Sequence, residues 1–267
     1  MKISIIIPTY NRPNLLSRAL ESVFAQKGDF EIVVIDDAST PETKKVVDLY
    51  LQKSPVPMFY IQQETNRGVN AARNRGIKEA GGEWIFCLDD DDELLSGAIA
   101  SVSEKIDTLP LNIDVMYFNS IIYNGTTCVD GGFQFTEGAL LYDPTYEDTM
   151  TKFGLKGDCK PVFRKSLFKN PRYLFPETLN GFESYTMSLL ARDKKGIRYF
   201  KEKSTRIHFN PKGNHLSNTA PRKNPIPLFK IHCKQLGEHA SFYLTHPIFS
   251  LKKIKVMLKL LIRVFLR

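Results

Sequence analysis

The segment ISIIIPTYNRPNLLSRALESVFAQKGDFEIVVIDDAST, residues 3–40, holds the clearest pattern in the sequence. Two runs of β-branched apolar residues, 3–7 and 31–35, enclose a stretch in which apolar residues recur every three or four positions. Pro13 stands where that stretch begins, and proline suits the first turn of a helix because its missing N–H is not needed there. Strand, helix and strand in this order predict two parallel strands joined by a crossover helix.

The same alternation continues to about residue 120. Further apolar strands are predicted at residues 58–61, 83–88 and 113–118, with helices that begin near Pro41, Val69 and Ser96. Strands that are almost continuous in apolar residues are typical of sheets covered by helices on both faces. The first part of the chain therefore predicts an α/β fold with a mostly parallel central sheet.

The pattern changes in the second half of the chain. Asn124-Gly125 separates two short apolar runs and predicts a β-hairpin with a type I′ turn. A helix is predicted at residues 183–191, and two short strands at 197–200 and 205–209. Residues 210–227 are rich in Pro and Asn and are predicted to form a mobile loop. We expect this half to be mixed α+β.

The composition excludes several classes of protein. With 42% hydrophobic and 25% charged residues, the chain has the composition of an ordinary globular protein, not of a disordered or collagenous one. The four cysteines show neither C-x-x-C spacing nor clusters with histidine, which argues against a zinc site or a redox pair. The sequence contains no recognisable signal peptide and no apolar run long enough to cross a membrane.

The positive charge is concentrated at the C-terminal end. The 267 residues carry a formal net charge of +8, and residues 252–267 hold six cations, while no Asp or Glu follows Glu238. The body of the chain is therefore nearly neutral. Because the basic tail is interleaved with apolar residues suited to lipid and no nucleic-acid-binding motif is present, a nucleic-acid partner is not expected.

Polar clusters directly follow three of the predicted strands. They are residues 9–12 after the first strand, 36–39 after the second and 89–92 after the fourth. In an open parallel sheet the carboxyl ends of the strands form the ligand-binding edge, so these clusters are expected to converge. The last cluster is four adjacent aspartates, whose mutual repulsion a divalent cation with a preference for oxygen would relieve. A solvated acidic loop is the alternative, but its position after a buried strand favours a binding site.

Four motifs follow one another along residues 2–118: Ser4-Ile5-Ile6-Ile7-Pro8-Thr9-Tyr10-Asn11-Arg12, Val34-Ile35-Asp36-Asp37-Ala38-Ser39, Asn66-Arg67-Gly68 with Ala72-Arg73-Asn74, and Leu88-Asp89-Asp90-Asp91-Asp92. Taken in this order, they resemble the motifs of the family 2 glycosyltransferases. The resemblance implies a GT-A fold, a nucleotide-diphospho-sugar donor of the UDP type, and Mn²⁺ or Mg²⁺ held by the acidic motif, residues 89–92.

The resemblance also implies roles for individual residues. The D-x-D pattern of the family falls on Asp89 and Asp91 as metal ligands, with Asp91 the main one and a catalytic contributor, and with the register open by one residue. Asp37 would accept a hydrogen bond from the nucleotide base, a role that suits an ionised carboxylate. Arg73 would bridge Asp37 and the acidic motif or reach the nucleotide, or else form only a surface ion pair. The expected donor-binding residues are Pro8, Tyr10, Asn11, Arg12, Asp37, Asn66, Arg73, Asp89 and Asp90.

Sugar transfer with inversion also needs a carboxylate that takes the proton of the acceptor hydroxyl. The family places this base in a Glu-Asp pair that opens a helix of the second half, and the nearest match here is Glu183 followed by Ser184. A serine hydroxyl is too weakly basic to replace the carboxylate, so Glu183 is the leading candidate and Glu177 the second. The alternative for Glu183 is an acidic residue that only satisfies N–H groups of a first helical turn.

The resemblance implies a division into residues 1–120 as the donor-binding half, 121–227 as the acceptor half that carries the base, and 228–267 as a helical extension. In this extension, cations at four-residue intervals from Lys255 to Arg267 would line one face of an amphipathic helix. Such a helix is predicted to lie on a membrane surface through residues 252–267. The alternative is packing against its own domain or against a second copy.

The sequence thus predicts an inverting, metal-dependent glycosyltransferase that moves a sugar from a UDP-type donor to a hydroxyl of a cell-surface glycan or lipid-linked saccharide. The enzyme itself is predicted to be cytoplasmic and bound peripherally at the inner face of the cell membrane. A non-catalytic sugar-nucleotide-binding subunit of a glycan assembly complex is the alternative that Ser184 raises. A nucleotidyltransferase would need a glycine-rich loop after the first strand, where the chain instead has Pro8-Thr9-Tyr10-Asn11.

Overall fold

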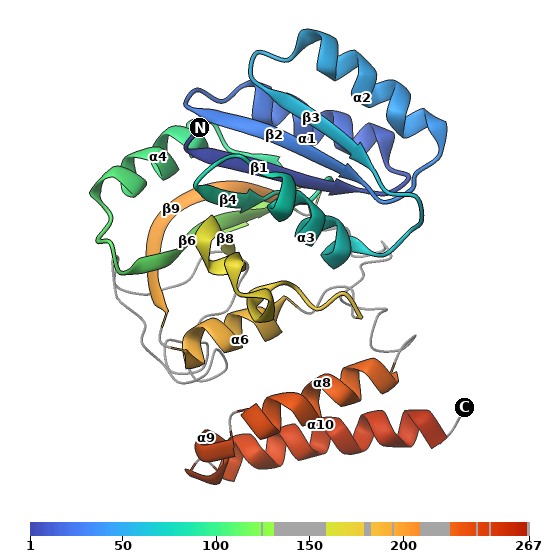
Figure 1. The fold of residues 1–267 in the computed structure, drawn as a ribbon, viewed down its shortest axis with the longest axis vertical. Coiled ribbons are helices and arrows are strands. Elements are labelled where there is room, and N and C mark those ends of the chain that lie inside the picture. Colours follow the sequence, from blue (N-terminus) through green and yellow to red (C-terminus); the bar gives the residue numbers. More distant parts are fainter. Residues whose placement is uncertain are drawn as a thin grey trace.

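A single mixed β-sheet organises the chain (Figure 1). The computed structural model describes residues 1–123, 125–130, 159–178, 183–193, 195–208, 225–238, 240–245 and 247–265. Along the sheet the strands follow the order β3-β2-β1-β4-β8-β6-β9-β5, and β7 pairs with β6. Strands from both halves of the sequence therefore belong to the same sheet.

The N-terminal part is a parallel β-α-β arrangement, as predicted. The register pairs Ile3 of β1 with Phe30 of β2 and with Trp84 of β4. Every residue of β1 and β2 is buried, because helices cover both faces of the sheet. The elements are β1 (Ile3–Thr9), α1 (Pro13–Phe24), β2 (Phe30–Asp36), α2 (Pro41–Lys53), β3 (Met58–Gln62), α3 (Val69–Glu79), β4 (Trp84–Cys87) and α4 (Ala98–Thr108).

The second half adds antiparallel strands to this sheet. The strand β8 lies between β4 and β6 and is antiparallel to both, whereas β9 is parallel to β6. The insertion of β8 brings its first residues beside the end of β4, where the acidic motif begins. The elements are β5 (Glu93–Leu94), β6 (Ile113–Tyr123), β7 (Cys128–Asp130), β8 (Cys159–Arg164), the 3₁₀ helices η1 (Lys165–Lys169) and η2 (Pro171–Tyr173), α6 (Ser184–Arg192) and β9 (Gly196–His208).

Three predictions for the second half need correction. The hairpin is present, but Tyr123 pairs with Cys128, so four residues separate the strands and the turn is not a two-residue type I′ turn. One strand, β9, stands where two were predicted. The charged residues 201–203 at the centre of β9 are at least partly exposed, so their charges do not interrupt the strand. Glu202 forms an ion pair with Lys105 of α4 at 2.6 Å. The predicted loop overlaps helix α8 from Pro225 onward, and the rest of it lies outside the described residues.

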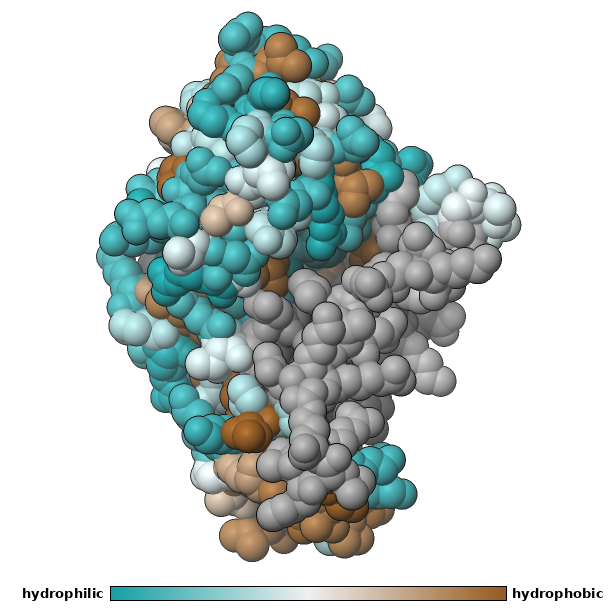
Figure 2. All heavy atoms as spheres, turned by 90° about the vertical axis from the view of Figure 1, so that its right-hand side faces the viewer, coloured by the Kyte–Doolittle hydropathy of each residue, from teal (hydrophilic) through white to brown (hydrophobic). Residues whose placement is uncertain are grey.

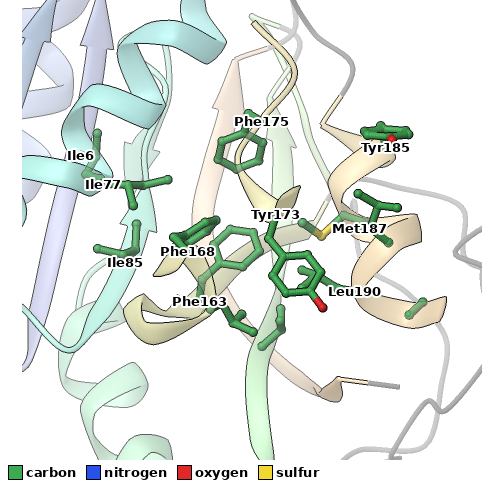
Figure 3. Close-up of a cluster of buried hydrophobic side chains, with 14 of the residues drawn as sticks. Ile6, Ile77, Ile85, Phe163, Phe168, Tyr173, Phe175, Tyr185, Met187 and Leu190 are labelled. Atoms are coloured by element: carbon green, nitrogen blue, oxygen red, sulfur yellow. The ribbon is translucent and has the colours of Figure 1, made fainter. Parts of the chain in front are cut away.

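The hydrophobic core has two layers, one on each face of the sheet. One layer packs α1, α2 and α4 on the sheet, and the other packs α3 and α6 on the opposite face. Figure 3 shows the second layer, in which Phe163, Phe168 and Phe175 fill the space between α3 and α6. Their rings contact one another edge to face or tilted, with centroids 5.4 to 6.3 Å apart. This packing fixes the segment that leads from β8 toward residue 177.

Three helices form the C-terminal part: α8 (Pro225–Glu238), α9 (Ala240–Thr245) and α10 (Pro247–Phe265). The helices α8 and α10 lie side by side in Figure 1, and Glu238 ties α8 to α6 by accepting a hydrogen bond from the Tyr185 hydroxyl at 3.0 Å. Within the described part of the chain, no helix combines the length and the apolar character needed to cross a membrane.

Candidate active site

The three polar clusters meet at the carboxyl ends of β1, β2 and β4. The Thr9 hydroxyl donates a hydrogen bond to Asp90 at 2.7 Å, and the Asp37 N–H donates to the Thr9 carbonyl at 2.9 Å. The Arg12 guanidinium lies 3.1 Å from Asp90 and 2.9 Å from Asp91. The register of the parallel strands, which ends all three at the same edge, produces this convergence.

The four aspartates of the acidic motif alternate between the interior and the surface. The side chains of Asp90 and Asp92 are only 6% and 5% exposed, whereas those of Asp89 and Asp91 are 29% and 34% exposed. The four residues form a turn after β4, in which the Asp92 N–H donates a hydrogen bond to the Asp89 carbonyl at 3.0 Å. Asp89 and Asp91 are thus the two more exposed carboxylates, which favours the register in which they form the D-x-D pair. Both oxygens of Asp89 accept hydrogen bonds, one from Arg73 and one from Lys160.

Lys160 of β8 forms ion pairs with two aspartates of the acidic motif. Its ammonium group lies 2.9 Å from Asp89 and 2.8 Å from Asp92, and the lysine is buried. Sequence reasoning gave Lys160 no role, because only the insertion of β8 beside β4 brings it to the motif. The stretch Lys160-Pro161-Val162-Phe163-Arg164-Lys165-Ser166-Leu167 resembles the family's approach to the base motif, but that resemblance assigns Lys160 no contact with the aspartates.

Burial and charge act differently on the carboxyl groups of the motif. Burial raises the pKa of Asp90 to about 7, although Arg12 and the hydrogen bond from Thr9 oppose the shift. Burial also raises the pKa of Asp92 to about 6, against the effect of Lys160. For Asp89 the neighbouring cations Lys160 and Arg73 outweigh burial and lower the pKa. Asp89 thus remains ionised, while the interior pair binds protons more readily.

Arg73 connects the acidic motif with the predicted base. It lies on α3, is buried, and donates hydrogen bonds to Asp89 at 2.5 Å, to Asn70 at 3.1 Å and to Glu183. Burial lowers the pKa of Arg73, but the charges of Asp89 and Glu183 outweigh it and raise the pKa. The contact expected with Asp37 is not formed, because Arg73 extends toward β4 and α6 instead. Because Arg73 is buried, the alternative of a surface ion pair is not supported.

Asp37 holds the loop that precedes α3. One of its oxygens accepts hydrogen bonds from the Gln63 side chain at 2.6 Å and from the Arg67 N–H at 2.7 Å, and the other accepts from the Gly68 N–H at 2.7 Å. Gly68 has a φ of 88°, a value that favours glycine. A carboxylate offers about four acceptor sites, so these three bonds leave capacity for the predicted contact with a nucleotide base.

The remaining predicted donor-binding residues lie around this edge. The ring of Tyr10 is 44% exposed, whereas Pro8 is buried at the end of β1. Asn11 joins the first two polar clusters, since its N–H donates to the Ser39 hydroxyl at 2.9 Å and its side-chain oxygen accepts from the Thr40 N–H at 2.8 Å. Asn66 is exposed. The edge thus combines an exposed aromatic ring with a rigid polar loop.

The two candidate bases occupy different positions. Glu183 directly precedes α6, and its side chain makes no capping hydrogen bond to that helix but pairs with Arg73. The alternative interpretation, a carboxylate used only to satisfy the first helical turn, is therefore not supported. Glu177 is more exposed and accepts hydrogen bonds from Arg67 at 2.7 Å and from Asn74 at 3.1 Å. Only Glu183 is linked to the acidic motif by a shared partner.

The ligand chemistry of the edge suits a hard cation. Among the described residues, no group of three or more His, Cys, Asp or Glu side chains is arranged to enclose a metal ion. The carboxylates of Asp89 and Asp91 could supply part of a coordination shell, and phosphate oxygens of a bound nucleotide the rest. Carboxylate oxygen is the ligand type that Mg²⁺ and Mn²⁺ prefer, so the residues present fit either ion.

Comparison with known proteins establishes the family. The family model "Glycosyl transferase family 2" matches residues 4–169, more than half of the chain. The chain therefore belongs to glycosyl transferase family 2.

Two curated relatives come from bacteria. One is the GalNAc(5)-diNAcBac-PP-undecaprenol beta-1,3-glucosyltransferase of Campylobacter jejuni, which is 33% identical over 213 residues, or 78% of this chain and 62% of that protein. The other is the poly(ribitol-phosphate) beta-N-acetylglucosaminyltransferase TarS of Staphylococcus aureus, 30% identical over 230 residues, or 82% of this chain and 37% of TarS. The matched part of the chain thus spans less than two thirds of the length of either relative.

Solved structures share the fold. The structure of S. aureus TarS 1-349 in complex with UDP-GlcNAc superimposes with a TM-score of 0.70 at 23% identity, covering 99% of this chain and 73% of that one. The mannosyltransferase PcManGT from Pyrobaculum calidifontis, solved in complex with GDP-Man and Mn²⁺, gives a TM-score of 0.62 at 16% identity, covering 98% and 73%. The predicted GT-A fold and family resemblance are confirmed.

Proposed function

We propose that this protein transfers a sugar, with inversion, from a UDP-sugar to a hydroxyl group of a cell-surface glycan or lipid-linked saccharide. The observation that carries the proposal is the position of Arg73, which contacts both Asp89 of the acidic motif and Glu183. A donor bound at the motif and an acceptor bound at Glu183 would therefore meet at this arginine. The names of the Campylobacter and Staphylococcus relatives support transfer of glucose or N-acetylglucosamine.

Donor binding is assigned to the edge formed by β1, β2 and β4. Pro8 and Tyr10 would contact the nucleotide base, Asp37 would accept the base N–H, and Asn11, Arg12, Asn66 and Asp90 would complete the pocket. Asp91 and Asp89 would hold Mg²⁺ or Mn²⁺ together with the diphosphate of the donor. The ion would supply positive charge that stabilises the leaving diphosphate.

Glu183 is assigned the role of general base. An acceptor hydroxyl would lose its proton to the Glu183 carboxylate as its oxygen forms a bond to the anomeric carbon and the bond to the diphosphate breaks. The ion pair with Arg73 fixes the direction of the carboxylate. Ser184 stands where the family has a second acid, so the base function would rest on Glu183 alone.

The acceptor class follows from the names of the relatives. The Campylobacter relative is named for an undecaprenol-linked saccharide and TarS for a poly(ribitol-phosphate) polymer. We assign this chain an acceptor of the same kind, a bacterial glycan or its lipid-linked precursor. Because polyprenol-linked precursors reside in a membrane, the protein would act at the membrane surface on the cytoplasmic side.

Calorimetric titration of UDP into the full chain, with and without Mn²⁺, tests the donor site. We expect Mn²⁺-dependent binding that Asp91→Ala abolishes and that Asp48→Ala preserves, since Asp48 is an exposed carboxylate paired with Lys44 on α2. Absence of UDP binding by folded wild-type protein would contradict the donor assignment. Mn²⁺-dependent UDP binding without transfer from any UDP-sugar in a panel would instead favour the non-catalytic subunit.

A further inference from the structure

The helix α10 exposes a continuous line of apolar side chains. Leu251, Ile254, Leu258 and Ile262 are 67%, 46%, 54% and 56% exposed. Their spacing of three, seven and eleven residues from the first places them along one side of a helix. We call these four residues the apolar stripe. Four aliphatic side chains exposed in a row are uncommon on a monomeric protein and mark an interaction surface.

The apolar stripe is not the face by which α10 packs on its own protein. The inner face of α10 carries Leu260 and Lys253, both buried, and the Lys253 ammonium donates a hydrogen bond to Gln235 of α8. Leu260 belongs to the same core cluster as Leu228 and Ile231 of α8. These contacts fix the rotation of α10 about its axis and leave the apolar stripe on the outside.

A row of cations runs beside the apolar stripe. Lys252, Lys255 and Lys259 are all exposed, and their spacing of three and seven residues places them on the neighbouring sector of the same helix. We call them the lysine row. No acidic residue follows Glu238, so α10 itself contains no carboxylate side chain. Figure 2 shows apolar residues gathered at the end of the molecule formed by α8 to α10.

We propose that the apolar stripe and the lysine row together form a docking surface for an anionic lipid bilayer, on which α10 lies parallel to the membrane plane. Apolar side chains that enter the acyl boundary next to lysines that face anionic headgroups are the arrangement by which interfacial helices bind. A second copy of the chain is a poorer occupant, because an antiparallel pairing of two apolar stripes would bring two lysine rows of like charge close together. This surface extends the proposed function and does not depend on it, since lipid binding needs no sugar donor.

Co-sedimentation of the full chain with lipid vesicles tests the docking surface. We expect the wild type to sediment with vesicles of phosphatidylcholine mixed with phosphatidylglycerol, and much less with phosphatidylcholine alone. Substitution of the lysine row by Gln is expected to lower binding to the anionic vesicles by about a hundredfold, because each lysine near such a surface contributes about fivefold. Substitution of the four apolar-stripe residues by Ser is expected to lower it at least about tenfold.

Matched controls separate the surface from general charge and hydrophobicity. The triple variant Lys27→Gln, Lys45→Gln and Lys78→Gln removes the same charge from exposed sites on the other part of the molecule, and Leu49→Ser with Leu111→Ser removes exposed leucines there. Both controls should bind vesicles like the wild type. All substituted side chains are exposed, so circular dichroism should show unchanged folding.

Three outcomes would overturn the proposal. In the first, the wild type does not sediment with anionic vesicles, and in the second, both α10 variants bind these vesicles as tightly as the wild type does. The third outcome is a dimer of the wild type in light scattering that the apolar-stripe substitutions convert to a monomer. The last outcome would assign the stripe to a second copy. UDP calorimetry on the same samples reports on the donor site separately, so failure of one proposal is distinguishable from failure of the other.

Discussion

Arg73 and Glu183 form an ion pair that joins the two halves of the molecule. Arg73 belongs to α3, which packs on the parallel strands β1 and β2, and Glu183 directly precedes α6. The same guanidinium also binds Asp89, so a single side chain contacts both the acidic motif and the proposed base. Any ligand that changes the charge at Asp89 therefore changes the electrostatic environment of Glu183.

Replacement of Arg73 by Met is predicted to impair both stability and donor binding. The change leaves Asp89 and Glu183 without their shared cation in a partly buried site, which should cost about 2 to 3 kcal/mol in urea unfolding. Arg73→Lys keeps the charge but loses the planar fork that reaches two carboxylates, so sugar transfer should fall at least about tenfold with a smaller loss of stability.

The matched control for Arg73 lies on the same helix. Arg75 is exposed and pairs with Glu79 at 2.9 Å, so Arg75→Met should change stability by less than about 0.5 kcal/mol and leave transfer unchanged. Equal effects of the Arg73 and Arg75 substitutions would show that the bridge between the two halves has no special role.

Lys160→Met is predicted to destabilise the fold by about 3 kcal/mol, because it leaves the buried Asp92 carboxylate without its cation. In the double variant Lys160→Met with Asp92→Asn, no buried carboxylate is left at position 92. Much of the lost free energy of unfolding should therefore return. Urea unfolding of the two single variants and the double variant measures this coupling. Additive effects would mean that Lys160 and Asp92 do not interact as the structure shows.

Gly76→Ala tests the packing of α3 against the sheet. A Cβ at Gly76 would overlap the Cγ2 atom of Ile6 in the fully buried strand β1, so we predict a loss of about 1 to 3 kcal/mol and displacement of α3. Gly237, also in a helix, has no atom within 4 Å of its added Cβ. Gly237→Ala should therefore stabilise the protein by about 0.5 kcal/mol. Thermal unfolding of both variants checks the opposite signs.

The N-terminal half of the fold could be predicted from sequence because its signals are local. The apolar runs of β1 and β2 are nearly continuous, and Pro13 and Pro41 mark where helices α1 and α2 begin. Two strands were harder to predict, β5 near the end of the first half and β8 in the second. The strand β5 has only two residues and β8 includes a proline, so neither shows a strand pattern, and both depend on pairing with distant strands.

The candidate site could be predicted only in part for the same reason. The aspartates follow a strand directly, which places them at the binding edge from local pattern alone. Arg73 lies only 16 positions before Asp89, but the other contacts of this network are distant in sequence: Lys160 reaches Asp89 across 71 positions, and Arg73 reaches Glu183 across 110. The family resemblance indicates that Arg73 could reach the acidic motif, but no spacing rule connects Lys160 with Asp89 or Arg73 with Glu183, and these two contacts follow only from the sheet topology.

The transfer rate of Glu183→Gln, measured beside its affinity for UDP, tests whether Glu183 takes the proton of the acceptor. The UDP-sugar that supports turnover of the wild type serves as donor, and Glu177→Gln serves as the control carboxylate. We predict that Glu183→Gln loses transfer by about 10²- to 10⁴-fold while its UDP affinity stays within about threefold, and that Glu177→Gln retains most activity. Near-normal transfer by Glu183→Gln, whether or not Glu177→Gln loses activity, would show that Glu183 is not the general base.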